Sequence, residues 1–235
     1  MLPKDSGVVQ TIFSQVPRTY ELTNHILTLG LDIVWRKRAA RIAAEAHPGQ
    51  WVDMCTGTGE MAVYLSRLAP NATTIYAIDF SGPMLDQARR KPQAANINFV
   101  AADVKALPFA DESFDLVTMS FATRNINLSK DMLTRTFAEF HRVLKPEGLF
   151  VNLETSQPSS ALLRKCFHLY LRLFVKMIGT RISGAKIPYA YLANTIPRFY
   201  QPEELTEILH QAGFKKVTVK KLFLGIAAIH KAEKS

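Results

Sequence analysis

The sequence VDMCTGTGE at residues 52–60 combines a short apolar run with two closely spaced glycines. This order predicts that a strand ends, that the chain turns, and that a helix begins directly afterwards. Gly57 and Gly59 let the backbone N–H groups of the turn approach a ligand at the helix N-terminus, and we expect Thr56 and Thr58 to contact the same ligand. A strand–helix turn without a ligand has a similar signature, so the turn alone does not identify one.

An acidic residue follows the second apolar run. Asp79 lies about twenty residues after the glycine turn, where a carboxylate can accept both ribose hydroxyls of an adenosine. We expect the neighbouring Phe80 and Met84 to contact this ligand as well. The alternative role for Asp79 is to cap the next helix, which Ser81 could also do.

A third acidic position separates two classes of adenosine ligand. Asp103 follows the third apolar run, where its carboxylate can accept from an adenine amino group beside the backbone N–H of Val104. Asp53 places another negative charge before the glycine turn, which would repel a pyrophosphate but attract a ligand with sulfonium and ammonium groups. The acidic residues therefore favour S-adenosylmethionine over NAD, with Ser120 after the fourth apolar run as a further contact.

The elements that must position these residues alternate along the chain. Short apolar runs alternate with helical segments of about ten residues, which is typical of βαβ units and a parallel sheet. The predicted strands are residues 51–54, 74–78, 97–100, 114–119, 149–153, 215–220 and 223–230. The predicted helices of this part are residues 60–68, 83–90, 130–144 and 201–211. The last two strands are too close for a helical crossover, so we expect the last strand to be antiparallel in a seven-stranded α/β sheet.

The remaining segments complete a single predicted domain. Residues 1–48 are interpreted as an N-terminal helical cap, with a basic amphipathic helix from about Val34 to Ala46, and residues 49–155 as the ligand-binding core. Residues 156–200 interrupt the alternation and are interpreted as a helical insertion that acts as a lid over the substrate. Residues 201–235 contribute the last helix and two strands.

The composition is that of a globular domain, with 235 residues of which 48% are hydrophobic. The sequence has no apolar run long enough to span a membrane and no signal peptide at its N-terminus, so we predict a cytoplasmic protein. Its two separated cysteines form neither a disulfide framework nor a metal cluster. We expect no metal, because no His, Cys and Asp residues have ligand spacing.

A net charge of +9 would suit either nucleic acid or an anionic membrane. Arg164, His168, Arg172 and Lys176 recur every four residues in an otherwise apolar segment, so they share one face of a predicted helix. Such a helix can lie in a lipid interface at the inner face of a membrane. The same pattern fits equally a helix that packs on the sheet with its basic side chains in water. We expect no nucleic acid partner, because the basic residues do not form a polar patch.

These motifs, in this order, resemble class I S-adenosylmethionine-dependent methyltransferases with a Rossmann-like fold. The resemblance narrows to the ubiquinone/menaquinone biosynthesis C-methyltransferase family and spans nearly the whole chain. The resemblance is carried by the sequences IFSQVPRTYELTN at 12–24, WR at 35–36, SFATRN at 120–125, RVLKP at 142–146, LETSQP at 153–158, YLANTIPRF at 191–199 and GIAAIH at 225–230. Its specific parts are Arg124-Asn125 and the segment at 191–199.

The resemblance implies methylation of a ring carbon of a reduced prenylated quinone precursor, a demethylmenaquinol or a related benzoquinol. It implies that Arg124, Asn125 and Tyr20 face the acceptor ring and that Glu60 assists. Arg124 would stabilise phenolate charge or hold a water, because an arginine is a poor base. A surface ion pair is the alternative role for Arg124, and a core aromatic position with its hydroxyl at the edge is the alternative for Tyr20.

The sequence departs from the family pattern at a few positions. Asp32 and Ile33 occupy the places of the usual His and Arg, and Glu21 and Glu60 replace aspartates. These positions bear on the identity of the methyl acceptor. Another lipophilic or small aromatic acceptor is therefore the alternative substrate. An RNA-binding protein or a non-catalytic cofactor-binding protein is the alternative of a different class. The sequence leaves open whether the chain forms a homodimer.

Overall fold

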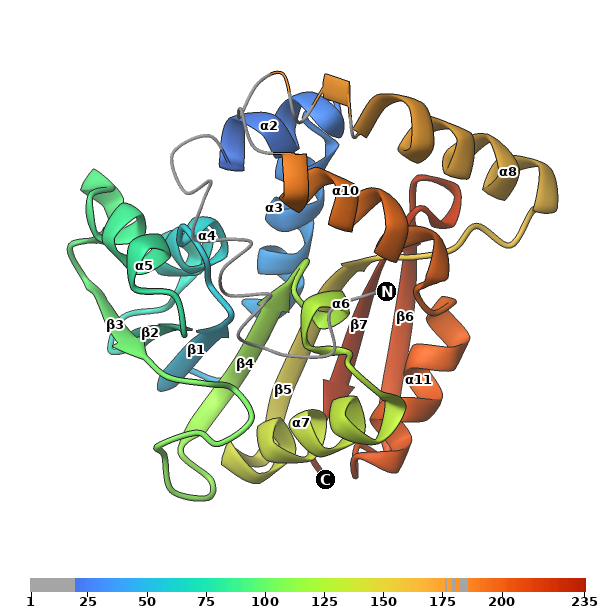
Figure 1. Ribbon diagram of the computed structural model, residues 1–235. Coiled ribbons are helices and arrows are strands. Elements are labelled where there is room, and N and C mark those ends of the chain that lie inside the picture. The colour runs from blue at the N-terminus through green and yellow to red at the C-terminus, as the bar shows by residue number, and fades with distance from the viewer. Residues whose placement is uncertain (1–19, 176, 179–180, 182–185) are drawn as a thin grey trace.

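The structure is a computed structural model that describes residues 20–175, 177–178, 181 and 186–235. Its strands are β1 (Gln50–Met54), β2 (Thr74–Asp79), β3 (Ile97–Ala101), β4 (Phe114–Ser120), β5 (Leu144–Thr155), β6 (Lys216–Leu222) and β7 (Ala227–Glu233). They form one sheet in the order β3-β2-β1-β4-β5-β7-β6 (Figure 1). The strands from β3 to β5 are parallel, and β7 is antiparallel to both of its neighbours. The prediction of a mostly parallel seven-stranded sheet is confirmed.

Helices cover the sheet on both faces and at one end (Figure 1). The α-helices are α2 (Tyr20–Leu27), α3 (Leu31–Ala43), α4 (Glu60–Leu68), α5 (Gly82–Arg89), α6 (Thr123–Ile126), α7 (Lys130–Val143), α8 (Ala161–Tyr170), α10 (Lys186–Thr195) and α11 (Pro202–Gln211). Short helical turns are η1 (Pro92–Ala94), η3 (Ile196–Arg198) and η4 (Phe223–Gly225), and η2 (Leu171–Val175) is a π-helix.

Three predicted element boundaries are wrong. The strand predicted to begin at residue 223 begins at Ala227, because Phe223 and Leu224 turn the chain with left-handed φ angles of 42° and 58°. The strand predicted from residue 149 begins at Leu144, which pairs with β4 before a shift in register. The amphipathic helix predicted from residue 34 begins three residues earlier, directly after Gly30 in the left-handed conformation.

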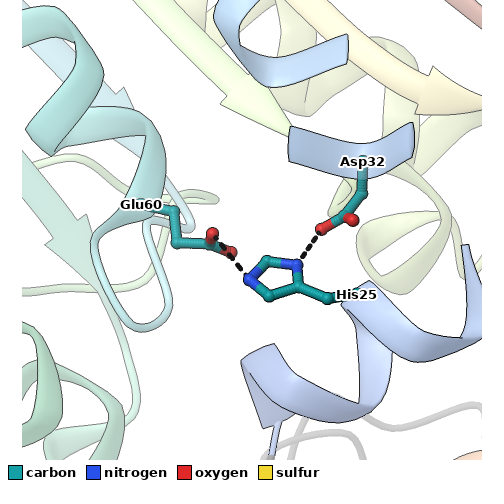
Figure 2. A group of neighbouring side chains, drawn as sticks. All are labelled: His25, Asp32 and Glu60. Atoms are coloured by element: carbon teal, nitrogen blue, oxygen red, sulfur yellow. Dashed lines mark hydrogen bonds and ion pairs between the residues drawn. The ribbon is translucent and has the colours of Figure 1, made fainter. Parts of the chain in front are cut away.

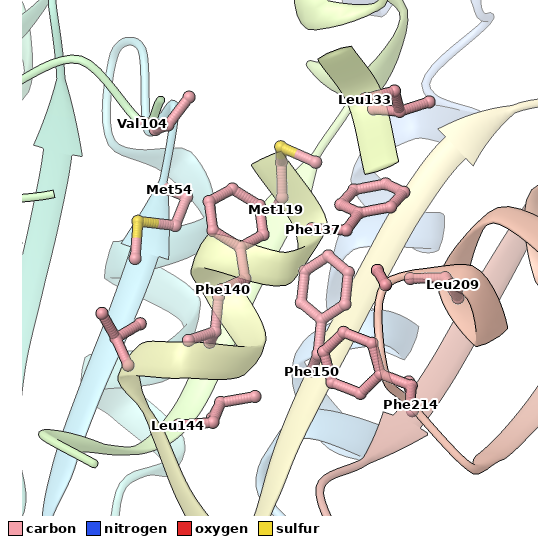
Figure 3. Close-up of a cluster of buried hydrophobic side chains, with 14 of the residues drawn as sticks. Met54, Val104, Met119, Leu133, Phe137, Phe140, Leu144, Phe150, Leu209 and Phe214 are labelled. Atoms are coloured by element: carbon pink, nitrogen blue, oxygen red, sulfur yellow. The ribbon is translucent and has the colours of Figure 1, made fainter. Parts of the chain in front are cut away.

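Two apolar layers enclose the sheet, because both of its faces are buried. On one face α7 and α11 pack over an aromatic cluster, in which Phe150 lies 5.5 Å from Phe137, 5.4 Å from Phe140 and 5.7 Å from Phe214 between ring centroids (Figure 3). On the other face α3 and α4 pack on the strands around the fully buried Trp51. The rigid sheet fixes the position of the loops that leave its carboxyl edge.

A helical cap gathers α2, α8 and α10 at one end of the sheet (Figure 1). Its own small core consists of Leu27, Leu171, Val175, Leu192 and Ile196. The Tyr170 hydroxyl also donates a hydrogen bond to the backbone oxygen of Leu27 at 2.5 Å. Segments far apart in the sequence are therefore tied together above the sheet.

Candidate active site

A pocket opens where the loops after β1, β2, β3 and β4 meet, and we call it the glycine-loop pocket. Its lining includes most of the residues predicted to bind the adenosine ligand: Thr56, Gly57, Thr58, Asp79, Phe80, Met84, Asp103, Val104 and Ser120. It also includes Glu60 and Asn125, which were predicted to act on the methyl acceptor. Parallel strands bring their carboxyl ends to the same edge of a sheet, which is where ligands of open α/β sheets bind. The structure therefore brings together residues that are up to 69 positions apart, from Thr56 to Asn125.

The glycine loop keeps its backbone open toward this pocket. Gly57 and Gly59 have φ angles of 56° and 81°, which side chains other than glycine rarely adopt. A Cβ atom on Gly57 would meet no atom within 4 Å, whereas one on Gly59 would lie 3.0 Å from Cβ of Ala88. Gly57 thus leaves room for a ligand, and Gly59 allows α4 and α5 to pack closely.

The carboxylate of Asp79 anchors this loop. Its Oδ2 accepts from the N–H of Gly57 at 2.8 Å, and its Oδ1 accepts from the N–H of Ser81 at 2.9 Å. Burial raises the pKa of Asp79, while the two N–H donors favour its charged form. Since each carboxylate oxygen has a second lone pair, Asp79 can accept from a ligand while it holds the loop.

Two residues predicted to contact the ligand support the loop from behind. Asp53 is buried below the pocket, where it accepts from Thr56 Oγ1 at 2.6 Å and from Thr118 Oγ1 at 2.8 Å. Burial is the main cause that raises the pKa of Asp53 to about 6. Neither Asp53 nor Gly59 lines the pocket itself. Both residues shape the glycine turn, and this turn lines the pocket.

The polar groups of the glycine-loop pocket fit an adenosine ligand. Asp103 is half exposed, with Oδ1 accepting from the N–H of Lys105 at 3.0 Å and Oδ2 lying 3.9 Å from Lys105 Nζ. Ser81 Oγ and Asn125 Oδ1 are buried without a hydrogen-bond partner in the described part of the chain. Buried polar atoms are normally paired, so these two atoms indicate a bound polar molecule.

A second cavity of about 380 Å³ lies between the sheet and the helical cap, and we call it the apolar pocket. Its walls come from α2, α3, α8, η2, α10 and η4, and they are mostly aliphatic and aromatic side chains such as Trp35, Leu171 and Leu192. Arg36 and Phe121 line both pockets, with the Arg36 guanidinium carbon 4.8 Å from the centroid of the Phe121 ring. The two pockets therefore meet at these two residues.

The short helix α6 sends adjacent side chains into different pockets. Asn125 lines the glycine-loop pocket and Arg124 lines the apolar pocket. Arg124 is buried, and its Nη1 donates to Glu154 Oε1 at 3.2 Å and to Thr155 Oγ1 at 3.0 Å. The alternative of a surface ion pair for Arg124 is wrong, because the pair is buried beside the apolar pocket.

Tyr20 begins α2, but its side chain lies outside the described residues.

A charged cluster joins α2, α3 and α4 beside the meeting point of the pockets (Figure 2). His25 Nδ1 lies 2.8 Å from Asp32 Oδ2, and His25 Nε2 lies 3.6 Å from Glu60 Oε1. Arg36 Nη1 lies 2.7 Å from Asp32 and 3.3 Å from Glu60. Burial raises the pKa of Glu60 against the opposing effect of Arg36. We call His25, Asp32, Arg36 and Glu60 the charged cluster.

The family model of the ubiE/COQ5 methyltransferase family matches residues 1–234. A demethylmenaquinone methyltransferase of Thermus thermophilus is 38% identical over 93% of this chain and 98% of its own length. The ubiquinone/menaquinone biosynthesis C-methyltransferase of Desulfotalea psychrophila is 34% identical over 98% of this chain and 91% of its own. The chain belongs to the ubiE/COQ5 methyltransferase family.

Solved structures confirm the methyltransferase fold. A methyltransferase from Thermotoga maritima, described as a possible histamine N-methyltransferase, superposes with a TM-score of 0.67 at 19% identity over 97% of this chain and 100% of its own. A methyltransferase from Aquifex aeolicus superposes with a TM-score of 0.55 at 20% identity over 79% of this chain and 82% of its own. At these identities the likeness concerns the fold, and the enzyme class comes from the family.

The structure adds residues to the site of this methyltransferase that sequence reasoning missed. Arg36 follows Asp32 by four residues, a spacing that predicts contact on one helix face. His25 was not singled out, because it meets Glu60 only through the packing of α2 against the core. Phe121 lies within the SFATRN sequence at 120–125, but no feature of that sequence predicts its contact with Arg36.

The ligand atoms of His25, Asp32 and Glu60 lie within 4.8 Å of one another, a spacing that a metal ion could use. The guanidinium of Arg36 already contacts both carboxylates and supplies the positive charge that they require. A cation placed among these groups would be repelled by that guanidinium. We therefore assign no metal to the charged cluster of this methyltransferase.

Proposed function

We propose that this methyltransferase transfers a methyl group to a ring carbon of a reduced prenylated quinone, such as a demethylmenaquinol. The observation that carries the proposal is the meeting of a polar, glycine-lined pocket with a large apolar pocket at Arg36 and Phe121. The names of the relatives from Thermus thermophilus and Desulfotalea psychrophila support a quinone substrate. The methyl donor is S-adenosylmethionine, which supplies a methyl group that is electrophilic because it is bound to a sulfonium.

The residues of the glycine-loop pocket would hold this donor. Asp79 would accept from the ribose hydroxyls, and Asp103 from the adenine amino group. The negative charge of Asp53, one layer below, would favour a ligand that carries positive groups. Ser81 and Asn125 have buried oxygen atoms that a polar ligand would pair.

The apolar pocket would hold the acceptor ring and the first part of its tail. Arg124 would stabilise the negative charge of a ring hydroxyl as it loses its proton, and Glu154 would keep the guanidinium in place. Glu60 would take the proton, because burial raises its pKa toward that of a useful base. We infer that residues 156–200 act as the lid, since α8 and η2 contribute to the outer wall of the apolar pocket.

The test is to incubate the protein with methyl-labelled donor and a panel of reduced quinones that vary in ring and tail length. Mass spectrometry should find the label on a ring carbon of a prenylated quinol. Oxidised quinones serve as the control, because they lack the hydroxyl proton that must leave. Label on an oxygen or on a small aromatic acceptor instead would replace the proposal with methylation of another acceptor.

We also propose that the protein binds reversibly to anionic membranes. No helix among the described residues is long and apolar enough to cross a bilayer. The outward side of α8 and η2 exposes Leu162, Leu169 and Leu173, together with the cations Lys165 and Arg172. A face that mixes apolar and basic side chains is suited to a lipid interface.

The predicted basic row is not continuous along this face. Arg164 Nη1 donates to the backbone oxygen of Pro158 at 3.3 Å, and His168 lies 2.7 Å from Gln157 Oε1, so both turn toward the protein. The helical phase then changes in the π-helix η2, which contains Arg172. Lys176 lies outside the described residues. The apolar face points outward instead, which favours lipid contact more than the predicted row did.

Exposed apolar residues also surround the mouth of the apolar pocket. Leu29 and Phe223 line this pocket and are 86% and 56% exposed. Exposed apolar side chains that cluster at an opening mark an interaction site. A quinol with a prenyl tail resides in the bilayer, so a membrane-facing opening would let it enter directly.

A further inference from the structure

The charged cluster provides a path from the buried site to solvent. Glu60 lines the glycine-loop pocket, and its side chain is 11% exposed. His25 lies on the outer side of Glu60, and its side chain is 26% exposed. Asp32, on the far side of His25, is nearly buried and lines the apolar pocket. Of these three residues His25 is the most exposed, and it lies between Glu60 and Asp32 (Figure 2).

We infer that His25, oriented by Asp32, accepts the proton that ring methylation leaves on Glu60 and passes it to solvent. This inference rests on the proposed function. His25 acts through Glu60 and does not touch the substrate, so it is a positioning and relay residue.

Hydrogen bonds fix the orientation of the imidazole. Thr28 Oγ1 donates to Asp32 Oδ1 at 2.6 Å, and Arg36 donates to Asp32 Oδ2 at 2.7 Å. The Asp32 carboxylate, held by these two bonds, lies 2.8 Å from His25 Nδ1. A carboxylate only accepts, so the neutral imidazole carries its proton on Nδ1. Its Nε2 is then free to accept a proton from Glu60. The 3.6 Å from Nε2 to Glu60 is longer than a hydrogen bond, but catalytic contacts are often long before substrate binds.

The charged cluster has an excess of one negative charge when His25 is neutral. Asp32 and Glu60 carry two negative charges, and Arg36 supplies one positive charge to both. A proton on His25 would balance the cluster. The nearby Glu21 is paired with Lys91 at 2.5 Å, so this second pair adds no net charge. Tyr64 on α4 has its pKa raised by burial and stays neutral.

The proposed reaction releases one proton per turnover, and this proton must travel from Glu60 to solvent. When the ring hydroxyl gives its proton to the Glu60 carboxylate, the O–H electron pair stays on the ring as phenolate. That electron density forms the new bond from ring carbon to methyl, and the electron pair of the broken sulfur–methyl bond remains on sulfur. The proton on the methylated carbon then moves to the ring oxygen and restores the aromatic ring. One proton per turnover remains on Glu60 and must leave before the next turnover.

The experiment measures kcat, KM and donor affinity of His25→Gln as a function of pH and of buffer concentration. We expect kcat to fall by about tenfold to a hundredfold, at or below the contribution of a direct general base. KM and donor affinity should change by less than twofold. His25→Ala should regain activity with added imidazole, because a small base can then take the proton. A merely structural role would give neither the imidazole rescue nor a dependence on buffer concentration.

His47→Gln is the matched control, because His47 is exposed and contributes a hydrogen bond only through its backbone oxygen. It should match the parent in every measurement. If the parent methylates a reduced quinone and His25→Gln keeps its rate and pH profile, the relay is wrong while the proposed function stands. If the parent methylates no reduced quinone under any condition, the proposed function and the relay fall together.

Discussion

The carboxylate of Asp79 is tied to the glycine loop by two backbone hydrogen bonds, so its loss would change both the charge and the shape of the donor site. At the scale of single residues, Asp79 is therefore the position where donor binding is most sensitive.

Asp79→Ala should weaken binding of S-adenosylmethionine by about 1–3 kcal/mol, because buried hydroxyls and N–H groups lose a charged acceptor. Calorimetric titration of parent and variant measures this loss. Asp86→Ala, at an exposed position on α5, is the control and should bind normally. Normal affinity in Asp79→Ala, or binding of NAD by the parent, would contradict the assignment of the pocket.

Asp53 makes stability depend on pH. Its pKa is raised to about 6 in the folded protein, above the value of about 3.9 for an unfolded chain. The folded state therefore binds more protons than the unfolded state between these values, so Asp53 lowers the free energy of unfolding as pH rises from 4 to 6. The effect amounts to about 1.4 kcal/mol for each unit of difference between the two pKa values.

Denaturant unfolding of Asp53→Asn at a series of pH values tests this contribution. The variant cannot ionise at this position, so its stability relative to the parent should increase over this pH range. A constant difference between the two proteins from pH 4 to 6 would show that the carboxyl is not perturbed.

Arg124 lies in a buried ion pair, so its replacement must keep a positive charge. Arg124→Lys retains the charge opposite Glu154 but loses the planar donor arrangement that faces the apolar pocket. We expect kcat to fall by about 10²-fold, as when one oxyanion donor is lost, with donor affinity nearly unchanged. Steady-state kinetics at saturating donor measures the effect, and Arg89→Lys on the exposed side of α5 is the control. A parent-like kcat would leave Arg124 with a scaffold role only.

At the scale of elements, the helical segment α8–η2 presents lipid-compatible side chains outward while its inner side closes the apolar pocket. Its phase is set by the π-helix η2, which turns Leu171 and Val175 into the small core of the cap. One irregular turn thus serves both the outer and the inner surface.

Lys165→Glu combined with Arg172→Glu should abolish binding to anionic vesicles, while the parent binds weakly and releases as salt rises. Vesicle co-sedimentation measures both effects. Lys130→Glu with Arg135→Glu on α7 is the matched control, because α7 and α8 lie at opposite ends of the molecule (Figure 1). Equal sedimentation of both double variants, or none of the parent, would remove the proposed membrane contact.

Local elements of the fold and the class of sheet could be predicted from the sequence, whereas contacts between individual side chains of distant elements could not. The glycine turn and Asp79 were predictable because strand, turn and helix follow one another within a few residues. The four-residue helix α6 is too short for a periodic signal. The contact of His25 with Glu60 depends on the packing of α2 against the core, which no local pattern records.

At the scale of the whole molecule, the two pockets meet at Arg36 and Phe121, which line both of them. The donor side is built from loops on the rigid sheet, whereas the acceptor side is built largely from the cap. The sequence predicted individual residues for the proposed donor side. For the proposed acceptor side the prediction came mainly from the resemblance to a family, because apolar cap residues carry no individual signature.

The exposed apolar rim of the apolar pocket, with Leu29 and Phe223 at its edge, has a kinetic consequence. An enzyme that takes its substrate sideways from a bilayer responds to the number of substrate molecules per area of membrane. The concentration per litre of solution then has little influence on turnover. Adding inert anionic lipid to vesicles with a fixed total amount of quinol should slow the reaction in proportion to the dilution within the surface. A rate that follows the total quinol instead would mean that the substrate reaches the pocket through water.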